Sequence, residues 1–398
     1  MRIRDFIDWS KAAFLGLGLA VCTQALPAKD LFPIVYLQRA EDPFYARHRV
    51  YTGLKLRDRH RPLAGAKVAI RESRVLGRAM GLGFELMERS LSPGEDPAEA
   101  IEASARDHGA GVFLLDLPLD DVTALASKLS RQNLVLFNVR HGDDRLRGVA
   151  CASNLFHTVP SNAMLMDGLA QFLFKKRWRD VLVLVGEDEA DRILREAFQR
   201  SAKKFQLDIV DVRPFVLKKD PRARDQNNIA LLTSGKDYDA VFLADSVGEF
   251  GRYVPFNTQR ARPVVGSEGL TASAWHWTWE RHGAPQLNQR FDKIAKRPME
   301  STDFAAWAAV KAIVEAVVRA KTTDVAMLRA LLRSDDFKVD TYKGVPGSFR
   351  VWSNQLRQAV LLHTHNAVSA RAPLDGFLHQ RNNLDTLGMD ERESRCKM

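Results

Sequence analysis

The sequence contains few cysteines, and none of them has the spacing of a metal or redox motif. Only Cys22, Cys151 and Cys396 occur in 398 residues. No two of them form a C-x-x-C pair, which argues against zinc-finger and thioredoxin-like motifs. Cys22 lies in the N-terminal segment, so an oxidising compartment would permit a disulfide between Cys151 and Cys396. Nothing in the sequence shows that these two residues meet.

The common cofactor and nucleophile motifs are also absent. There is no G-x-G-x-x-G turn and no P-loop. The stretch "GSEGLTAS" (266–273) does not have the G-x-S-x-G spacing of a nucleophile elbow. His363 and His365 would share one face of a strand, as a metal pair would, but no third ligand follows at a suitable spacing. A structural role is therefore favoured for them, and the sequence gives no support for an enzyme.

No hydrophobic run is long enough to cross a bilayer. The strongly apolar N-terminal stretch, Ala12–Cys22, is shorter than the ~20 residues that a spanning helix needs. Basic residues precede it and the small-residue stretch "TQALPA" follows it. This order is typical of a secretory signal peptide, so we predict that residues 1–28 direct export to the periplasm. Cleavage after residue 25 or residue 28 would fit the pattern.

The chain is basic, but its positive charges are not concentrated in one segment. The formal net charge is +10, and the Lys and Arg residues are scattered along the sequence. No zinc-finger, RNP-type or basic-helix pattern accompanies them. The excess of positive charge is therefore interpreted as a solvated basic surface, and no nucleic-acid partner is expected.

What the sequence does contain is an alternation of short apolar runs and longer amphipathic segments. The expected strands are 34–37, 67–70, 112–115, 134–138, 181–185, 208–212, 240–243 and 263–265. The expected helices are 77–90, 97–108, 122–131, 162–176, 192–205, 227–234, 250–258 and 304–321. Near the end, "GSFRVWSN" and "QAVLLHTHN" are expected to form two strands joined by a turn. The alternation predicts an α/β fold with two doubly wound parallel-sheet lobes.

Three stretches, in order, resemble a known family. "NLFHTVPSN" (154–162), "PVVGSEGLTAS" (263–273) and "YKGVPGSFRVW" (342–352) are similar to segments of branched-chain amino-acid-type periplasmic binding proteins. The resemblance implies a type I periplasmic binding protein-like fold, with two lobes, three crossovers and a ligand cleft between the lobes. It also implies a monomeric, non-enzymatic protein that delivers a solute to an ABC permease in the inner membrane.

The resemblance also sets expected boundaries. Lobe one would comprise 29–156 with about 274–335, and lobe two 157–273 with about 336–372, followed by a C-terminal tail at 373–398. The tail "RAPLDGFLHQRNNLDTLGMDERESRC" (371–396) and the start "IVYLQRAEDP" (34–43) resemble a subgroup associated with PQQ-dependent alcohol dehydrogenase systems.

Polar residues directly after the predicted strands are candidates for ligand binding. In open α/β sheets, ligands bind beyond the carboxyl ends of the strands. The candidates chosen on this basis are Asp120, Asp121, Asn138, Arg140, Glu189, Asp245 and Glu268. By the resemblance, Asp120 and Asp121 replace hydroxyl residues that hold an amino-acid carboxylate, and Glu268 matches an acid that faces the ligand ammonium group. Two carboxylates at the first of these positions would repel an amino acid's carboxylate.

Five of the candidates are carboxylates, which suggests a hard cation as ligand. Asp120, Asp121, Glu189, Asp245 and Glu268 would offer the oxygen-rich shell that Ca²⁺ prefers. A lanthanide has the same preference, and the resemblance to quinoprotein-associated proteins favours it as the transported ligand.

Two alternatives remain open at this point. Strand-end acids such as Asp120, Asp121 and Glu187 also serve as caps of the helices that follow. In addition, Arg39, Arg71 and Arg140 could neutralise the acids or bind an anion such as a carboxylic acid or PQQ. The alternative function is therefore the binding of a small alcohol-derived, carboxylic acid or amine solute. A periplasmic sensor or chaperone that feeds no permease is a further possibility.

Overall fold

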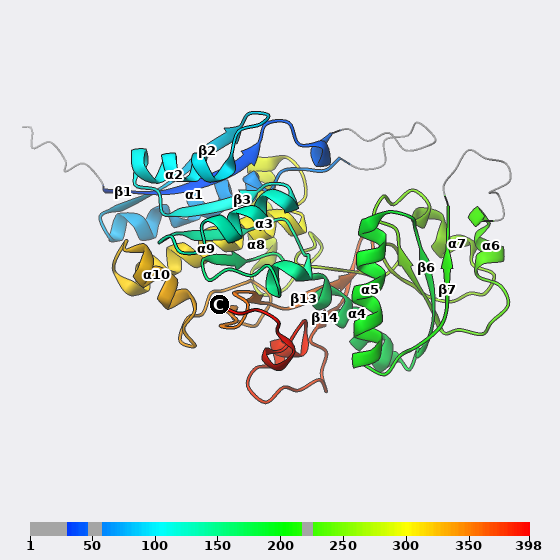
Figure 1. Cartoon of the computed structure of the whole chain (residues 1–398). Helices are drawn as coiled ribbons and strands as arrows, with labels where there is room; N and C mark the ends of the chain where they lie inside the picture. The colour runs from blue at the N-terminus through cyan, green and yellow to red at the C-terminus, as the bar shows by residue number, and fades with distance from the viewer. Residues whose placement is uncertain (1–29, 47–57, 217–225) are drawn as a thin grey trace, which may run out of the picture.

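The computed structural model describes residues 30–46, 58–216 and 226–398. It contains two α/β lobes that lie side by side and are joined near the middle of the molecule (Figure 1). This confirms the predicted fold class. The predicted signal peptide lies outside the described residues. Within the described ranges, no helix is long and apolar enough to cross a membrane.

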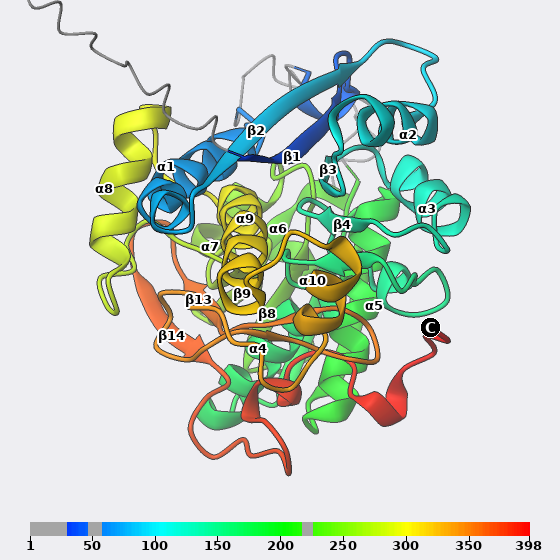
Figure 2. The same cartoon turned by 90° about the vertical axis from the view of Figure 1, so that its left-hand side faces the viewer.

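Lobe one is built around a five-stranded parallel sheet with the strand order β2-β1-β3-β4-β5. Its strands are β1 (Asp30–Arg39), β2 (Leu82–Leu91), β3 (Val112–Asp116), β4 (Val135–Asn138) and β5 (Leu155–His157). Its helices are α1 (Leu63–Ala79), α2 (Pro97–His108), α3 (Leu119–Lys128), α8 (Ala284–Ala295), α9 (Ser301–Ala320) and α10 (Val325–Leu332). The 20-residue α9 is apolar on nearly all sides because it is the central helix of the lobe-one core. It packs against α1 and α10, and α8 packs against α1 on the side away from α9 (Figure 2).

Lobe two contains a four-stranded parallel sheet with the order β7-β6-β8-β9. Its strands are β6 (Asp180–Val185), β7 (Asp208–Pro214), β8 (Ala240–Ala244) and β9 (Val264–Gly266), and its helices are α4 (Asn162–Lys176), α5 (Glu189–Lys204), α6 (Ile229–Leu232) and α7 (Val254–Asn257). The two central strands, β6 and β8, are apolar runs buried on both faces, as expected for a parallel sheet covered by helices.

Two elements early in the chain differ from the prediction. Residues 67–70, predicted to form a strand, belong to α1, and residues 82–90 of the helix predicted at 77–90 belong to β2. The apolar residues of α1 are buried at helical spacing, and the close contact of Gly65 with the backbone of Asp303 brings α1 against α9. β2 is an edge strand with half-exposed faces, so its sequence lacks the continuous apolar run of the central strands.

The chain crosses between the lobes three times. The first crossover follows β5 at residues 158–161, the second follows β10 (Thr271–Ser273), and the third lies between β12 (Leu356–Arg357) and β13 (Val360–His363). β13 pairs with β10 and with β14 (Val368–Ala372), whereas β12 pairs with β11 (Ser348–Phe349). The stretches "GSFRVWSN" and "QAVLLHTHN" each contain a strand, as predicted, but β12 lies between β11 and β13, so the two are not joined by a single turn.

The predicted boundary at about residue 336, where the chain was expected to return to lobe two, also differs from the structure. Residues 336–356 were expected in lobe two, but Phe337, Val339, Phe349 and Leu356 are buried in the lobe-one core. The β11–β12 hairpin therefore belongs to lobe one, and the chain returns to lobe two only after it.

Buried Lys343 connects all three crossovers. Its Nζ donates to the carbonyl oxygen of Ala274 at 2.9 Å and to Oε1 of Gln358 at 2.7 Å. The amide of Gln358 in turn donates to the carbonyl oxygen of Thr158 at 2.7 Å. Complete burial lowers the pKa of Lys343 well below its usual value. Because each partner comes from a different crossover, Lys343 fixes the three strands of the junction relative to one another.

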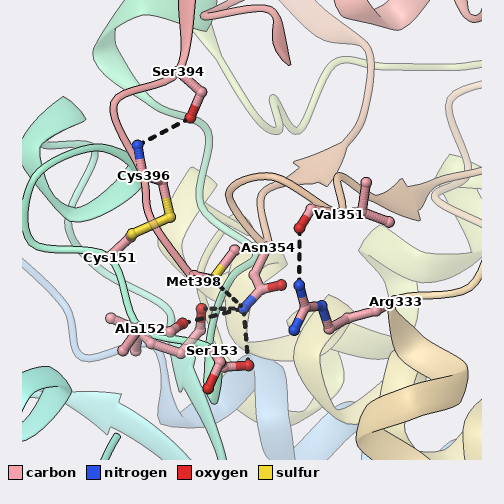
Figure 3. Close-up of a disulfide and its surroundings, with 10 residues drawn as sticks. Cys151, Ala152, Ser153, Arg333, Val351, Asn354, Ser394, Cys396 and Met398 are labelled. Atoms are coloured by element: carbon pink, nitrogen blue, oxygen red, sulfur yellow. Dashed lines mark hydrogen bonds between the residues drawn. A yellow bond between two sulfur atoms is a disulfide. The ribbon is translucent and has the colours of Figure 1, made fainter.

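The two cysteines that the sequence left unassigned form a disulfide. Cys151, between β4 and β5, is bonded to Cys396 near the C-terminus, with 5.6 Å between their Cα atoms (Figure 3). The link joins positions 245 residues apart, which is why spacing alone could not reveal it.

Candidate functional site

The carboxyl ends of the lobe-one strands carry a compact cluster of charged and aromatic side chains. We call Arg39, Asp42, Phe44, Tyr45, Arg59, Arg61, Asp116 and Arg140 the lobe-one cluster. Asp42 caps the 3₁₀ helix η1 (Pro43–Tyr45), which follows β1, by accepting a hydrogen bond from the backbone N–H of Phe44. This turn places Tyr45 beside Asp116, at the end of β3, and Phe44 beside Arg140, which follows β4.

Asp116, the last residue of β3, is the centre of the lobe-one cluster. Its carboxylate is fully buried and accepts hydrogen bonds from the hydroxyls of Tyr36, at 2.8 Å, and Tyr45, at 2.6 Å. Arg61 donates to the same carboxylate at 3.1 Å. Burial and the nearby carboxylate raise the pKa of both tyrosines, so their hydroxyls stay protonated and act as donors. Asp116 thus connects β3 to β1, to η1 and to the segment that precedes α1.

Arg140 is pinned between the acids and the aromatic rings. Its guanidinium lies 2.5 Å from the carboxylate of Asp42 and 3.5 Å from that of Asp116, and it covers the ring of Phe44 at 4.1 Å. Arg59 also lies over the Phe44 ring, at 4.4 Å. The Nε of Arg140 is buried and has no hydrogen-bond partner among the described residues. A buried hydrogen-bond donor is therefore left over within the lobe-one cluster.

The predicted lobe-one residues have different roles. Asp121 forms a two-pronged ion pair with Arg39, at 2.6 and 2.9 Å, and is therefore already neutralised. Asp120 lies in the first turn of α3 and is exposed. The buried Asn138 shapes the loop after β4, because it accepts from the N–H of His141 at 2.9 Å and donates to its carbonyl oxygen at 2.8 Å.

The loop residue His141 is held neutral by its surroundings. One ring nitrogen lies 2.6 Å from the carbonyl oxygen of Leu117. Burial is the main cause that lowers the pKa of His141 to about 4. The imidazole therefore donates to Leu117 at neutral pH and links the loops that follow β3 and β4.

The predicted lobe-two acids are not equivalent either. Glu189 begins α5, forms an ion pair with Arg192 and has a side chain that is 71% exposed. Asp245 is buried and accepts from the N–H groups of Gly248, at 2.8 Å, and Gly251, at 2.6 Å. Burial raises the pKa of Asp245. Its carboxylate therefore stabilises the turn after β8 rather than pointing to solvent.

Glu268 lies close to this same turn. A side-chain methyl placed on Gly251 would meet both Glu268, at 3.1 Å, and Asp245, at 3.0 Å. Gly251 thus permits the two acidic segments to approach. Glu268 also takes part in contacts of its own and is not a free carboxylate.

An arginine that the sequence analysis did not select links the two lobes electrostatically. Arg145, in η2 (Asp144–Arg147), binds Asp143 at 2.7 Å, and its pKa is raised chiefly by this hydrogen bond. Glu189 of lobe two and Asp120 of lobe one add to this rise through their charges. Arg145 therefore interacts electrostatically with the start of α3 and with the start of α5. Direct contact nearby comes from Arg200 of α5, whose guanidinium lies 2.5 Å from Asp144.

The five carboxylates do not assemble into one cation shell in this arrangement. Residues 30–46, 58–216 and 226–398 contain no group of three or more His, Cys, Asp or Glu side chains that could hold a metal ion. Asp121 is paired with an arginine and Asp245 with backbone amides, whereas Glu189 is exposed beside Arg192. The hard-cation hypothesis thus gains no support from the side-chain geometry.

Two other predicted features lie away from the strand ends. Arg71 is on α1 and lines a surface hollow of about 520 Å³ on the flank of lobe one, together with residues of β2 and α8. His363 stacks on His276 with ring centroids 4.0 Å apart, and burial is the main cause that lowers the pKa of His276 to about 4. This contact agrees with the structural role expected for His363.

The aromatic residues of the lobe-one cluster, and its arginines Arg59 and Arg61, were not among the candidates predicted from the sequence. Phe44, Tyr45, Arg59 and Arg61 lie on the long connection between β1 and α1, several residues beyond the strand. The signal that could have located them is the sequence "DPF", in which an aspartate before a proline is typical of a capped turn start. Only folding shows that Arg61 returns to Asp116.

Comparisons with known proteins agree with this architecture. No protein-family model and no curated protein matches the chain. Among solved structures, a branched-chain amino acid ABC transporter periplasmic ligand-binding protein from Burkholderia xenovorans aligns with a TM-score of 0.69 at 14% identity. The alignment covers 92% of this chain and 99% of that one. The chain has the type I periplasmic binding protein fold.

Two further structures show the same likeness. A periplasmic binding protein from Burkholderia mallei has a TM-score of 0.64 and 14% identity, covering 93% of this chain and 99% of that chain. An ABC transporter solute-binding protein from R. palustris, in complex with benzoate, has a TM-score of 0.62 and 13% identity, covering 92% of this chain and 100% of that chain. At these identities the likeness establishes the fold of this chain and not its ligand.

Proposed function

We propose that this protein is the periplasmic solute-binding component of an ABC transporter and takes a small ligand between its lobes. The observation that carries the proposal is the pair of parallel-sheet lobes joined by three crossovers. Binding at the carboxyl ends of the strands is the rule for such sheets, and a hinge between lobes permits closure on a ligand. The similar structures named above carry solute-binding descriptions, which supports the proposal.

The lobe-one cluster favours a small organic anion, such as a carboxylate, as the ligand. Arg59 is an exposed cation without an ion pair among the described residues, and it lies over Phe44. The unpartnered Nε of Arg140 lies beside the same ring. A carboxylate would accept hydrogen bonds from these groups, and an apolar body would pack against the 38% exposed Phe44. The solved relative with benzoate shows that this fold can hold such a solute.

A hard cation is the second candidate, with a lanthanide or Ca²⁺ as the transported ligand. Asp120 and Glu189 are exposed and both act electrostatically on Arg145 where the lobes meet. A closing motion that moved Arg145 aside would bring these acids together. The link to PQQ-dependent alcohol oxidation belongs to the same proposal and rests on the resemblance of residues 371–396.

Isothermal titration of the mature protein separates these ligands. We would titrate benzoate, acetate, PQQ, leucine, Ca²⁺ and La³⁺. We expect binding heat from an organic anion such as benzoate or acetate and none from the amino acid leucine. Arg59→Gln should weaken carboxylate binding at least tenfold, whereas the exposed Arg131→Gln should not change it. Heat from La³⁺ that disappears in Glu189→Gln would instead select the cation. Turnover of alcohols or esters would contradict the binding-protein assignment.

A second measurement tests the function itself. A ligand that closes the lobes should reduce the radius of gyration measured by small-angle scattering at saturation. A bound ligand that leaves the radius of gyration unchanged would contradict closure around the interlobe site.

A further inference from the structure

The C-terminal tail, residues 373–398, is docked on lobe two along its first half. Phe377 packs edge-to-face against Phe174 of α4 and Phe205, with ring centroids 5.9 and 5.5 Å apart. Leu387 is fully buried in the lobe-two core. The N–H of Gly388 donates to Asp167 of α4 at 2.7 Å. These contacts attach the segment from Phe377 to Gly388 to α4 and its neighbours.

A lysine of α5 strengthens this attachment. The Nζ of Lys204 donates to the carbonyl oxygen of Gly388 at 2.9 Å and to the carboxylate of Asp167 at 2.8 Å. The charge on Asp167 is buried and is matched by Lys204 and the Ser201 hydroxyl. Loss of the tail would therefore leave this carboxylate with one hydrogen-bond donor fewer.

The same tail is held by lobe one through a buried ion triad. Asp385 accepts from Arg350 and Arg357, each at 2.8 Å, and all three side chains are buried. Arg350 also donates to the carbonyl oxygens of Leu384, at 3.0 Å, and Leu387, at 2.5 Å. The two arginines come from the β11–β12 hairpin, which packs in the lobe-one core.

The end of the tail returns to lobe one and is bonded there covalently. The disulfide attaches Cys396 to Cys151, and Asn354 donates to the sulfur of Met398 at 3.5 Å and to the carbonyl oxygen of Ala152 at 3.2 Å (Figure 3). Cys151 lies four residues before β5, the edge strand of the lobe-one sheet. The tail therefore passes from lobe two to lobe one beyond Gly388.

We propose that the tail is a fourth connection between the lobes, closed by the disulfide, and that it restricts the opening of the hinge. Asp385 is held by lobe one and Gly388 by lobe two, and three residues of extended chain reach only ~10 Å. Wider separation at this place must break the triad or pull Gly388 from α4. If the triad breaks, the disulfide still limits the separation, because eight residues from Gly388 to Cys396 reach ~29 Å at most.

The ligand-free protein provides the test, so the result does not depend on the proposed solute. Spin labels would be attached to genetically encoded non-natural amino acids, so that no cysteine is used. The labelled positions would be the exposed Val75 in lobe one and Leu231 in lobe two. Pulsed electron–electron double resonance then gives the distribution of distances between the two labels, one in each lobe. Wild type should show one narrow distribution. Cys151→Ser/Cys396→Ser combined with Asp385→Asn should at least double its width.

The matched control is Asp375→Asn, which makes the same chemical change at an exposed tail position and should leave the width unchanged. Hydrogen exchange at residues 389–398 reports whether the tail has been released. If the triple variant does not fold, Asp385→Asn alone can be folded with its disulfide and then reduced with a phosphine, which removes the same two restraints, and the same broadening is expected. A released tail with an unchanged distance distribution would overturn the proposal.

Discussion

Replacement of Asp116 by Asn should destabilise the folded protein strongly, although the side chain keeps its shape. Asp116 is fully buried and accepts from the hydroxyls of Tyr36 and Tyr45 and from Arg61, with Arg140 at 3.5 Å. Hydrogen bonds to a charged group contribute about 1.5–3 kcal/mol each. Removal of one partner of a buried ion pair costs about 3–5 kcal/mol, because the remaining charge stays uncompensated.

Asparagine can satisfy only part of this arrangement. Its oxygen can still accept, and a tyrosine hydroxyl can rotate to accept from the new NH₂ group. A guanidinium cannot accept, so Arg61 and Arg140 lose the charge that they share. We therefore expect a loss of about 3 kcal/mol in the free energy of unfolding, near the lower end of the range for a broken buried pair.

The assay is urea unfolding followed by circular dichroism at neutral pH. Asp120→Asn, an exposed position four residues after Asp116, is the matched control and should change the free energy of unfolding by less than about 0.5 kcal/mol. A loss below about 1 kcal/mol for Asp116→Asn, at unchanged denaturant slope, would refute the view that this carboxylate organises the lobe-one cluster.

Three other changes have defined outcomes. His141 has a folded pKa of about 4 and an unfolded pKa of ~6.5, so only the unfolded chain takes up a proton between these values. The contribution of His141 to the free energy of unfolding should fall by up to about 3 kcal/mol as pH drops from 6.5 to 4, and His141→Gln should make this part of the curve less steep, with the slope due to His276 remaining. Lys343→Met should lower the free energy of unfolding by about 2 kcal/mol, because buried acceptors on Ala274 and Gln358 lose their donor; an unchanged melting temperature would contradict this. Mass spectrometry of the periplasmic form should show that residues 1 to about 25–28 are absent, and an intact Met1 would exclude cleavage.

The regular parts of the fold could be predicted because their pattern is local. The helices at 97–108 and 162–176 have the predicted bounds, and the buried runs of β3, β6 and β8 were located to within one residue. The apolar residues of these elements follow the pattern expected for a helix or for a buried strand. Side-chain caps mark the starts of both helices. The alternation of strand and helix also determined the fold class, since parallel strands require crossover helices.

The early boundary between α1 and β2 could not be derived in this way. β2 lies at the sheet edge with both faces partly exposed, so its polar and apolar residues do not separate cleanly. Its register is instead set by ten residues of pairing with β1. Such pairing involves residues about 50 positions apart, and a local pattern does not contain it.

In the candidate site, the difference between what the sequence predicts and what only the tertiary structure decides is larger. The sequence determined which acids follow the strands, but only the tertiary structure decided which cations neutralise them. Asp121 meets Arg39 across 82 positions, and Asp245 turns back onto its own loop. Burial decides the outcome, because a carboxylate removed from water must find a cation or N–H groups, and the nearest donor is a matter of packing. For the same reason, the pairing of Cys151 with Cys396 depends on where the tail docks and not on any spacing in the chain.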